Sequence, residues 1–153
     1  MNTIYMMIGI PGSGKTTIAK RLQESLNAVI ISSDVVRSHH PDWKEECIFP
    51  EVYRQIAKNL NSGSNVIFDA TNIDCQTRAK HLRAIRAFIS SFRLVAYVIL
   101  ADPDICIKRI ILRNEKKVEL FLPPEVTLFY HHKLVHPALE EGFDDIITIQ
   151  NDI

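Results

Sequence analysis

A glycine-rich segment near the start of the chain has the residue types that bind a triphosphate. It reads Gly-Ile-Pro-Gly-Ser-Gly-Lys-Thr over residues 9–16 and fits the phosphate-loop pattern at every fixed position. Glycines permit the tight turn and let backbone N–H groups approach phosphate oxygens. In this pattern the lysine neutralises the β- and γ-phosphates and the threonine offers its hydroxyl to Mg²⁺. We therefore expect ATP to bind through Gly9, Pro11, Gly12, Ser13, Gly14, Lys15, Thr16 and Thr17.

Acidic and basic side chains that could hold an acceptor follow the second predicted strand. Asp34 and Arg37 lie one helical turn apart if a helix starts here, so they would share a face. A carboxylate can accept the proton of an attacking hydroxyl, and an arginine can hold a phosphate by two parallel bonds. The pair suits an acceptor with a hydroxyl and a nearby phosphate. The alternative is that Asp34 only caps a helix and pairs with Arg37.

The third predicted strand ends in Asp69-Ala70-Thr71-Asn72. Phosphate-loop enzymes place a Mg²⁺-binding acid at such a position, so Thr16 and Asp69 form the predicted metal site. Thr71 and Asn72 could orient the acceptor. A structural or capping acid is the alternative for Asp69.

Basic residues gather late in the chain, where a lid could fold over ATP. Arg109 and Arg113 are four residues apart on a predicted helix, and Lys117 follows four residues later. Their charges could stabilise the transferring group. The apolar stretch 118–123 suits a mobile flap, so the lid is expected at about 113–124. A solvated basic helix end is the alternative.

A second basic stretch has no acidic residue between Asp74 and Asp102. It is the best sign in the sequence of a polyanionic partner. An ordinary solvated helix face explains it equally well. The basic residues of this stretch are Arg78, Lys80, Arg83, Arg86 and Arg93.

Apolar runs and periodic segments must position these side chains. Strands are predicted at 4–8, 28–31, 65–68, 92–100 and 146–149, with helices at 15–26, 50–61, 77–90 and 103–114 and a short one from Pro123. This alternation predicts one α/β domain over 1–153, of the P-loop NTPase type. It would be a three-layer sandwich whose mostly parallel five-stranded sheet has helices on both faces and a small lid.

Composition bears on where the protein is found and does not identify a partner. The 153 residues carry 18 basic and 18 acidic side chains, so no net charge drives the chain to nucleic acid or membrane. No apolar run approaches the roughly 20 residues of a membrane span. Three scattered cysteines suggest reduced thiols, and we expect a cytoplasmic protein with no membrane partner.

Taken together, these motifs resemble the kinase domain of polynucleotide kinases. The resemblance covers the phosphate loop, Ser-Ser-Asp-x-x-Arg at 32–37, Asp-Ala-Thr-Asn at 69–72, Arg113-Asn114, Pro123-Pro124 and the acidic segment 140–144. It implies transfer of the ATP γ-phosphate to a 5′-hydroxyl of DNA or RNA. It also implies that Asp34 is the general base and that Arg37 contacts the phosphate on the 3′ side of the acceptor.

The chain departs from this family at the lid. The family has Arg-Asn-x-x-Arg, whereas this chain has Arg113-Asn114-Glu115-Lys116-Lys117. Lysine keeps the charge but lacks the forked contact of arginine. Either Lys117 takes the family role, or Arg113 and Arg109 do.

Two other functions remain open from the sequence. The same loop and acid would serve a kinase of a small-molecule hydroxyl, such as a nucleoside, sugar or antibiotic. A non-catalytic ATP-binding module is the third reading, because the loop alone does not prove phosphate transfer.

Overall fold

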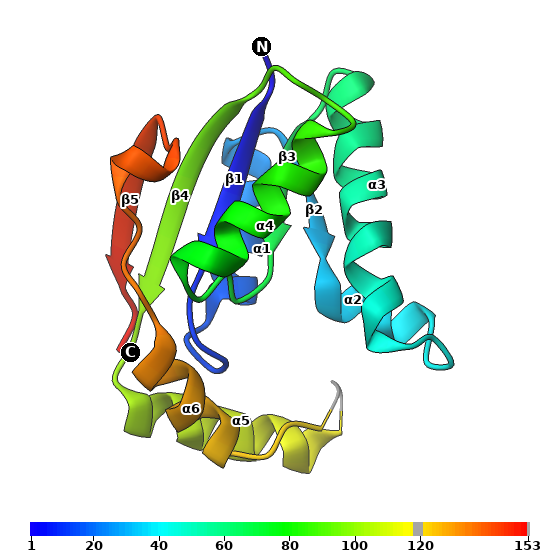
Figure 1. Cartoon of the computed structure of the whole chain (residues 1–153). Helices are drawn as coiled ribbons and strands as arrows, with labels where there is room; N and C mark the ends of the chain where they lie inside the picture. The colour runs from blue at the N-terminus through cyan, green and yellow to red at the C-terminus, as the bar shows by residue number, and fades with distance from the viewer. Residues whose placement is uncertain (118–120, 153) are drawn as a thin grey trace.

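Five parallel strands form one sheet in the order β2-β3-β1-β4-β5 (Figure 1). The computed structural model describes residues 1–117 and 121–152. Every neighbouring pair of strands runs parallel, which confirms the predicted α/β class with a sheet that is parallel throughout. The strands are β1 (Thr3–Ile8), β2 (Ala28–Ser32), β3 (Asn65–Asp69), β4 (Arg93–Leu100) and β5 (Asp145–Gln150).

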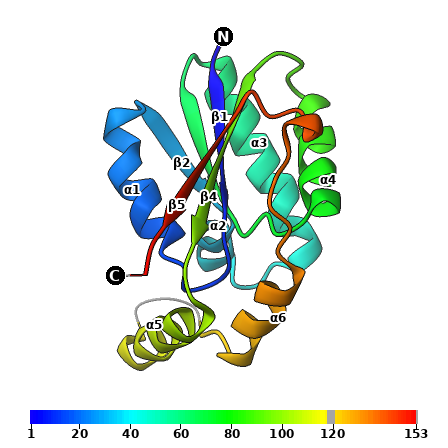
Figure 2. The same ribbon diagram turned by 90° about the vertical axis from the view of Figure 1, so that its left-hand side faces the viewer.

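Helices cover both faces of this sheet and also its lower edge, where the strands end (Figures 1 and 2). One face carries α3 (Ile48–Asn61) and α4 (Cys75–Arg86), and the other carries α1 (Lys15–Ser25). At the edge lie α2 (Ser33–His39), α5 (Pro103–Lys116) and α6 (Glu125–Lys133). Two short 3₁₀ helices are η1 (Glu45–Cys47) and η2 (Leu139–Glu141). Among the described residues no helix is both long and apolar enough to cross a membrane.

The central strand β1 shows why the sheet needs both helical layers. Its side chains alternate between two cores: Ile4, Met6 and Ile8 pack in the core beneath α3 and α4, whereas Met7 packs in the core beneath α1. Successive residues of a strand point to opposite faces. A strand that is apolar on both faces must therefore be covered twice, as in other all-parallel sheets.

Two helices begin earlier than the apolar periodicity predicts. Helix α3 starts at Ile48 rather than at Pro50, because N–H groups in a first turn have no helical partner and proline fits there. Helix α4 starts at Cys75 because the side chain of Asp74 accepts a hydrogen bond from the Thr77 N–H at 2.8 Å. It ends at Arg86, four residues before the expected end.

Arg78 is a structural residue of α4 and not part of its basic surface. Its side chain is fully buried. Its Nε lies 2.8 Å from Oε1 of Glu141 in η2, and its Nη1 donates to the carbonyls of Asn72 and Val135 at 2.9 and 3.0 Å. This guanidinium joins α4 to the segments that follow β3 and α6. The sequence had grouped Arg78 with residues that could bind a polyanion, and its burial corrects that interpretation.

We predict that Arg78→Ala lowers the free energy of unfolding by about 3–5 kcal/mol, because it leaves Glu141 and two carbonyls without their buried donor. The matched control is Arg83→Ala, on the same helix but exposed, which should change stability by less than about 0.5 kcal/mol. Urea denaturation followed by circular dichroism measures both. Equal stability of the two variants would contradict the structural role of Arg78.

Candidate phosphate-binding and acceptor site

The phosphate loop joins the end of β1 to the start of α1, in the strand–loop–helix context that the motif requires. The Gly9 N–H donates to the carbonyl of Thr71 at 3.1 Å, which fixes the loop against the end of β3. Gly14 is the N-cap of α1, with a φ of 89°. The first N–H groups of α1 lack partners within the helix. They lie at the positive end of the helix dipole, next to the phosphate loop. This arrangement favours an anion.

Two glycines of the loop are required by close approach as well as by backbone conformation. Gly12 has a φ of +84°, and a Cβ atom there would overlap the backbone carbonyl of Cys106 in α5. Gly14 would place a Cβ atom on the side-chain amide of Asn151. The loop is therefore enclosed by α5 on one side and by the segment after β5 on the other.

Arg109 and Asn151 brace the outer side of this loop. Arg109 Nη1 donates to the carbonyls of Gly12 and Ser13 at 3.1 and 3.2 Å, and its Nη2 donates to the carbonyl of Asn151 at 2.8 Å. The Asn151 amide in turn donates to the Ser13 carbonyl at 2.8 Å. Arg109, expected to act from a lid, is thus placed against the loop itself. Asn151 was missed, although the end of a parallel strand is where a ligand-side residue is expected.

Thr16 and Asp69, the two residues expected to hold a metal ion, lie together next to the loop. The Thr16 hydroxyl donates to Oδ2 of Asp69 at 2.8 Å, and Asp69 is buried. Hydroxyl and carboxylate oxygens are the ligands that Mg²⁺ prefers. The residues present therefore fit the expected metal.

The acceptor pair lies on α2, which the Ser32 hydroxyl caps by accepting from the Val35 N–H at 3.3 Å. Arg37 donates to Asp34 at 2.7 Å and holds both oxygens of Glu45 at 2.5 and 3.1 Å. The Asp34 side chain is 65% exposed and that of Glu45 is 69% exposed. Glu45, from the 3₁₀ helix η1, had no signal in the sequence, and the structure makes it a second partner of Arg37.

Asn72 is placed differently from the expectation that it orients an acceptor. Its side chain is 1% exposed and donates to the Met7 carbonyl at 2.8 Å. In this structure it braces the ends of β1 and β3. Thr71 is partly exposed and bonds the loop through its carbonyl.

Aromatic rings lie beside Arg37 and in the loop that follows α2. The Arg37 guanidinium lies 5.8 Å from the Phe49 ring, which stacks on the buried ring of His81. Burial lowers the pKa of His81 to about 4, so this ring is neutral near pH 7. In the loop after α2, Trp43 is 40% exposed and stacks on His40 at 3.6 Å between ring centroids.

Besides Arg109, a second residue expected in the lid, Arg113, lies beside the phosphate loop. It shares with the loop a depression of about 240 Å³. Lys117 is at the C-cap of α5 with a φ of 54° and is exposed.

Asn114 fixes the segment after α5 by exchanging two hydrogen bonds with the backbone of Leu122, at 2.7 and 3.1 Å. The expected flap at 118–123 lies partly outside the described residues. The depression is lined by Gly12, Gly14, Lys15, Thr16, Thr17, Arg109, Ile110 and Arg113.

Comparison with known proteins relates most of the chain to one family. The sequence pattern of the AAA-domain family matches residues 4–128. An L-seryl-tRNA(Sec) kinase of Methanococcus maripaludis is 24% identical over 151 residues, which cover 92% of this chain and 56% of that protein. A shikimate kinase of Corynebacterium diphtheriae is 52% identical over 33 residues, or 22% of this chain and 19% of that protein. The chain thus spans about half the length of the first relative and less of the second.

Solved structures show the same fold. A candidate kinase of Chloroflexus aurantiacus J-10-fl superposes with a TM-score of 0.81 over 99% of this chain and 89% of its own. The two sequences are 16% identical. This likeness supports the three-layer P-loop architecture derived from the sequence.

We predict that Gly12→Ala lowers ATP affinity at least tenfold, because the added Cβ atom must displace α5 or the loop. Gly63→Ala is the matched control: its φ is +92°, yet nothing lies within 4 Å of a Cβ atom there. That variant should bear only the backbone penalty of about 1 kcal/mol and bind ATP normally. Isothermal titration calorimetry with ATP and Mg²⁺ compares them. Normal binding by Gly12→Ala would contradict the enclosed geometry of the loop.

Proposed function

This chain belongs to the AAA-domain family, and we propose that it is an ATP-dependent kinase that phosphorylates the 5′-hydroxyl end of DNA or RNA. The proposal depends most on one observation, that the Asp34–Arg37 pair follows β2 at the same edge of the sheet as the phosphate loop. The register of the sheet supports it. Ser32 of β2 pairs with Asp69 of β3, and Asp69 pairs with Met7 of β1. Neighbouring strands lie about 4.8 Å apart, so Asp34 follows β2 at the edge that carries Asp69 and the loop.

This arrangement suits in-line transfer of a phosphoryl group. The acceptor hydroxyl would lie between Asp34 and the γ-phosphate held by the loop, and the Asp34 carboxylate would take its proton as the new P–O bond forms. Lys15 and Arg113 would neutralise charge on the transferring oxygens. Thr16 and Asp69 would hold Mg²⁺, which would supply further neutralisation of the phosphate charge.

The contacts of Arg37 support an acceptor that carries its own phosphate. Glu45 and Asp34 now occupy the forked guanidinium. Exposed ion pairs are worth only about 0–1 kcal/mol, so a phosphate can replace Glu45 at low cost. A bidentate phosphate contact would then leave Asp34 available to the hydroxyl. Glu45 would act as a stand-in for the acceptor phosphate.

The exposed Trp43–His40 stack favours a nucleic acid among phosphate-bearing acceptors. It lies in the loop that Glu45 ties to Arg37. Stacking of a base on an aromatic side chain is worth about 1–3 kcal/mol and tolerates any base.

A kinase of a small hydroxylated anion is the second candidate. The local match to a shikimate kinase favours it, and Arg37 could bind a carboxylate as readily as a phosphate. Incubation with γ-labelled ATP separates the two. Label on a 5′-hydroxyl oligonucleotide supports our proposal, whereas label only on members of a metabolite panel supports the second candidate.

We predict that Asp34→Asn lowers the rate of phosphate transfer by roughly 10²–10⁴-fold, because an amide cannot accept the proton. ATP affinity should stay within about twofold, since Asp34 lies on the acceptor side. Asp42→Asn, an exposed acid in the loop after α2, is the control and should keep full activity. Turnover of Asp34→Asn at the wild-type rate would remove Asp34 as the base.

We predict that Arg113→Ala reduces kcat at least tenfold and that Lys117→Ala leaves it within about twofold. Arg113 lines the phosphate depression, whereas Lys117 ends α5 in an exposed position. Steady-state kinetics with saturating ATP compares the variants. The reverse pattern would assign the lid role to Lys117, as its place in the family motif suggests.

A further inference from the structure

Helix α4 carries exposed basic side chains in addition to its buried Arg78. Lys80, Arg83 and Arg86 are all exposed, and the stretch from Cys75 to Ala101 contains no acidic residue. The structure therefore divides the basic stretch noted in the sequence. Arg78 belongs to the interior. The exposed basic side chains of α4 form what we call the α4 basic face: Lys80, Arg83 and Arg86.

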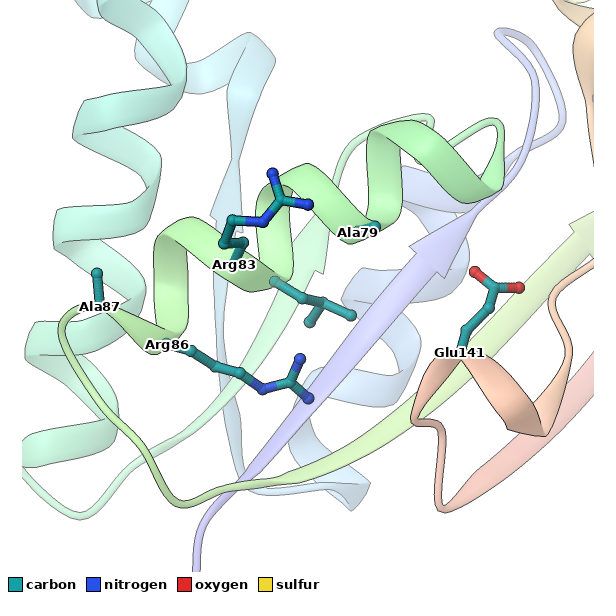
Figure 3. Close-up of a pocket in the computed structure, with 6 residues that line it drawn as sticks. Ala79, Arg83, Arg86, Ala87 and Glu141 are labelled. Carbon is teal, nitrogen blue, oxygen red and sulfur yellow. The ribbon is translucent and has the colours of Figure 1, made fainter.

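The α4 basic face borders a depression of about 530 Å³ between α4 and η2. Figure 3 shows Arg83 and Arg86 on α4, with Glu141 across from them on η2. Ala79 and Ala87 also line the depression, and Leu82 contributes an apolar wall. The two alanines leave space beside α4 that longer side chains would fill. The depression is large enough for a phosphate group and part of its sugar.

Two acidic residues in and just after η2 are already engaged. Glu141 accepts from Nε and Nη2 of Arg78 and from the Ala138 N–H. These contacts lower its pKa against the opposing effect of burial, so the carboxylate stays charged and paired. Asp144 accepts from the Leu94 N–H at 2.9 Å. Glu140, also in η2, is exposed and is the acid that would most oppose an anion here.

Arg86 is partly positioned before any ligand arrives. Its guanidinium lies 5.4 Å from the centre of the Phe92 ring, within the range of a cation–π contact. A side chain that is already ordered loses less entropy when it binds. Arg83 lies one turn earlier on the same helix.

We propose that the α4 basic face binds the phosphate backbone of a nucleic acid whose 5′ end occupies the acceptor site. This inference rests on the proposed function and extends it to the length of the substrate. Helix α4 starts just after the strand-end edge that carries Asp69 and Asn72, and it runs away from that edge (Figure 1). Its 12 residues span about 18 Å. At about 3.4 Å per nucleotide of a stacked strand, this equals on the order of five nucleotides.

The test compares substrates that do and do not reach the far end of α4. The double variant Arg83→Ala/Arg86→Ala should raise the KM for a 5′-hydroxyl 20-mer about tenfold. Its KM for a 5′-hydroxyl dinucleotide and for ATP should stay within about twofold. The logarithmic dependence of 20-mer binding on salt should flatten by about 1.4, since each lost phosphate contact on a single strand contributes about 0.7.

The control variant is Lys20→Ala/Arg21→Ala, which removes the same charge from exposed positions of α1 on the other face of the sheet. It should leave all three KM values and the salt slope unchanged. Circular dichroism melting checks that both variants fold. Equal effects of the two variants would mean that net charge alone matters, and unchanged 20-mer kinetics in the α4 variant would overturn the site.

Direct binding separates this inference from the kinase proposal. Fluorescence anisotropy with a labelled 20-mer reports binding whether or not phosphate is transferred. If no oligonucleotide is phosphorylated but the 20-mer binds with a salt slope that the α4 variant reduces, the kinase assignment fails and the binding face stands. If wild-type protein does not bind the 20-mer, the binding face is rejected. If the 20-mer is phosphorylated and the α4 variant binds it normally, only the inference about α4 fails.

Discussion

Close approach of a backbone to a polyanion is the constraint on which this structure depends. Amide N–H groups can surround a triphosphate only if the loop turns tightly, and Gly12 and Gly14 permit this turn by adopting positive φ values. The loop is held from outside by Arg109 and Asn151, which bond its carbonyl groups. Helix α5 is packed so closely that a Cβ atom on Gly12 would overlap it. The phosphate loop is therefore built jointly by three segments that are distant in the sequence.

The parallel sheet supplies the second half of the site. Parallel strands end at one edge, and connections between them must return over the faces of the sheet. Because β1, β2 and β3 are neighbours, the phosphate loop, α2 and Asp69 meet at the same edge. The hydrogen bond between Thr16 and Asp69, at 2.8 Å, shows that the segment after the phosphate loop and the end of β3 meet there. The start of α2, where we propose that the acceptor binds, follows β2 at this same edge.

Basic side chains of this protein have different roles according to whether they are buried or exposed. The net charge of zero does not reveal this difference. Arg78 and Arg83 both belong to α4. Arg78 is fully buried against Glu141, whereas Arg83 is exposed. Their helical positions differ by five residues, which places them on different sides of the helix. On α2, Arg37 is shared by Asp34 and Glu45. These exposed pairs are exchangeable, whereas the buried pair is structural.

The order of strands and helices, the phosphate loop and the acids at the strand ends followed from the sequence, because they depend on local pattern. Apolar periodicity located the elements, and glycine, lysine and threonine at fixed spacing located the loop. Local pattern missed the exact ends of α3 and α4, where a tolerated proline and the Asp74 cap decided the boundary.

Contacts between distant segments were decided only by the tertiary structure. Asn151 lies 138 residues from Ser13 yet bonds its carbonyl, and the burial of Asn72 and Arg78 depends on which segments pack around them. The partnership of Arg37 with Glu45 depends on how the chain returns after α2. Spacing along a chain predicts which side chains share a helix face or a strand end, but it contains no measure of which remote donor and acceptor the folded core brings together.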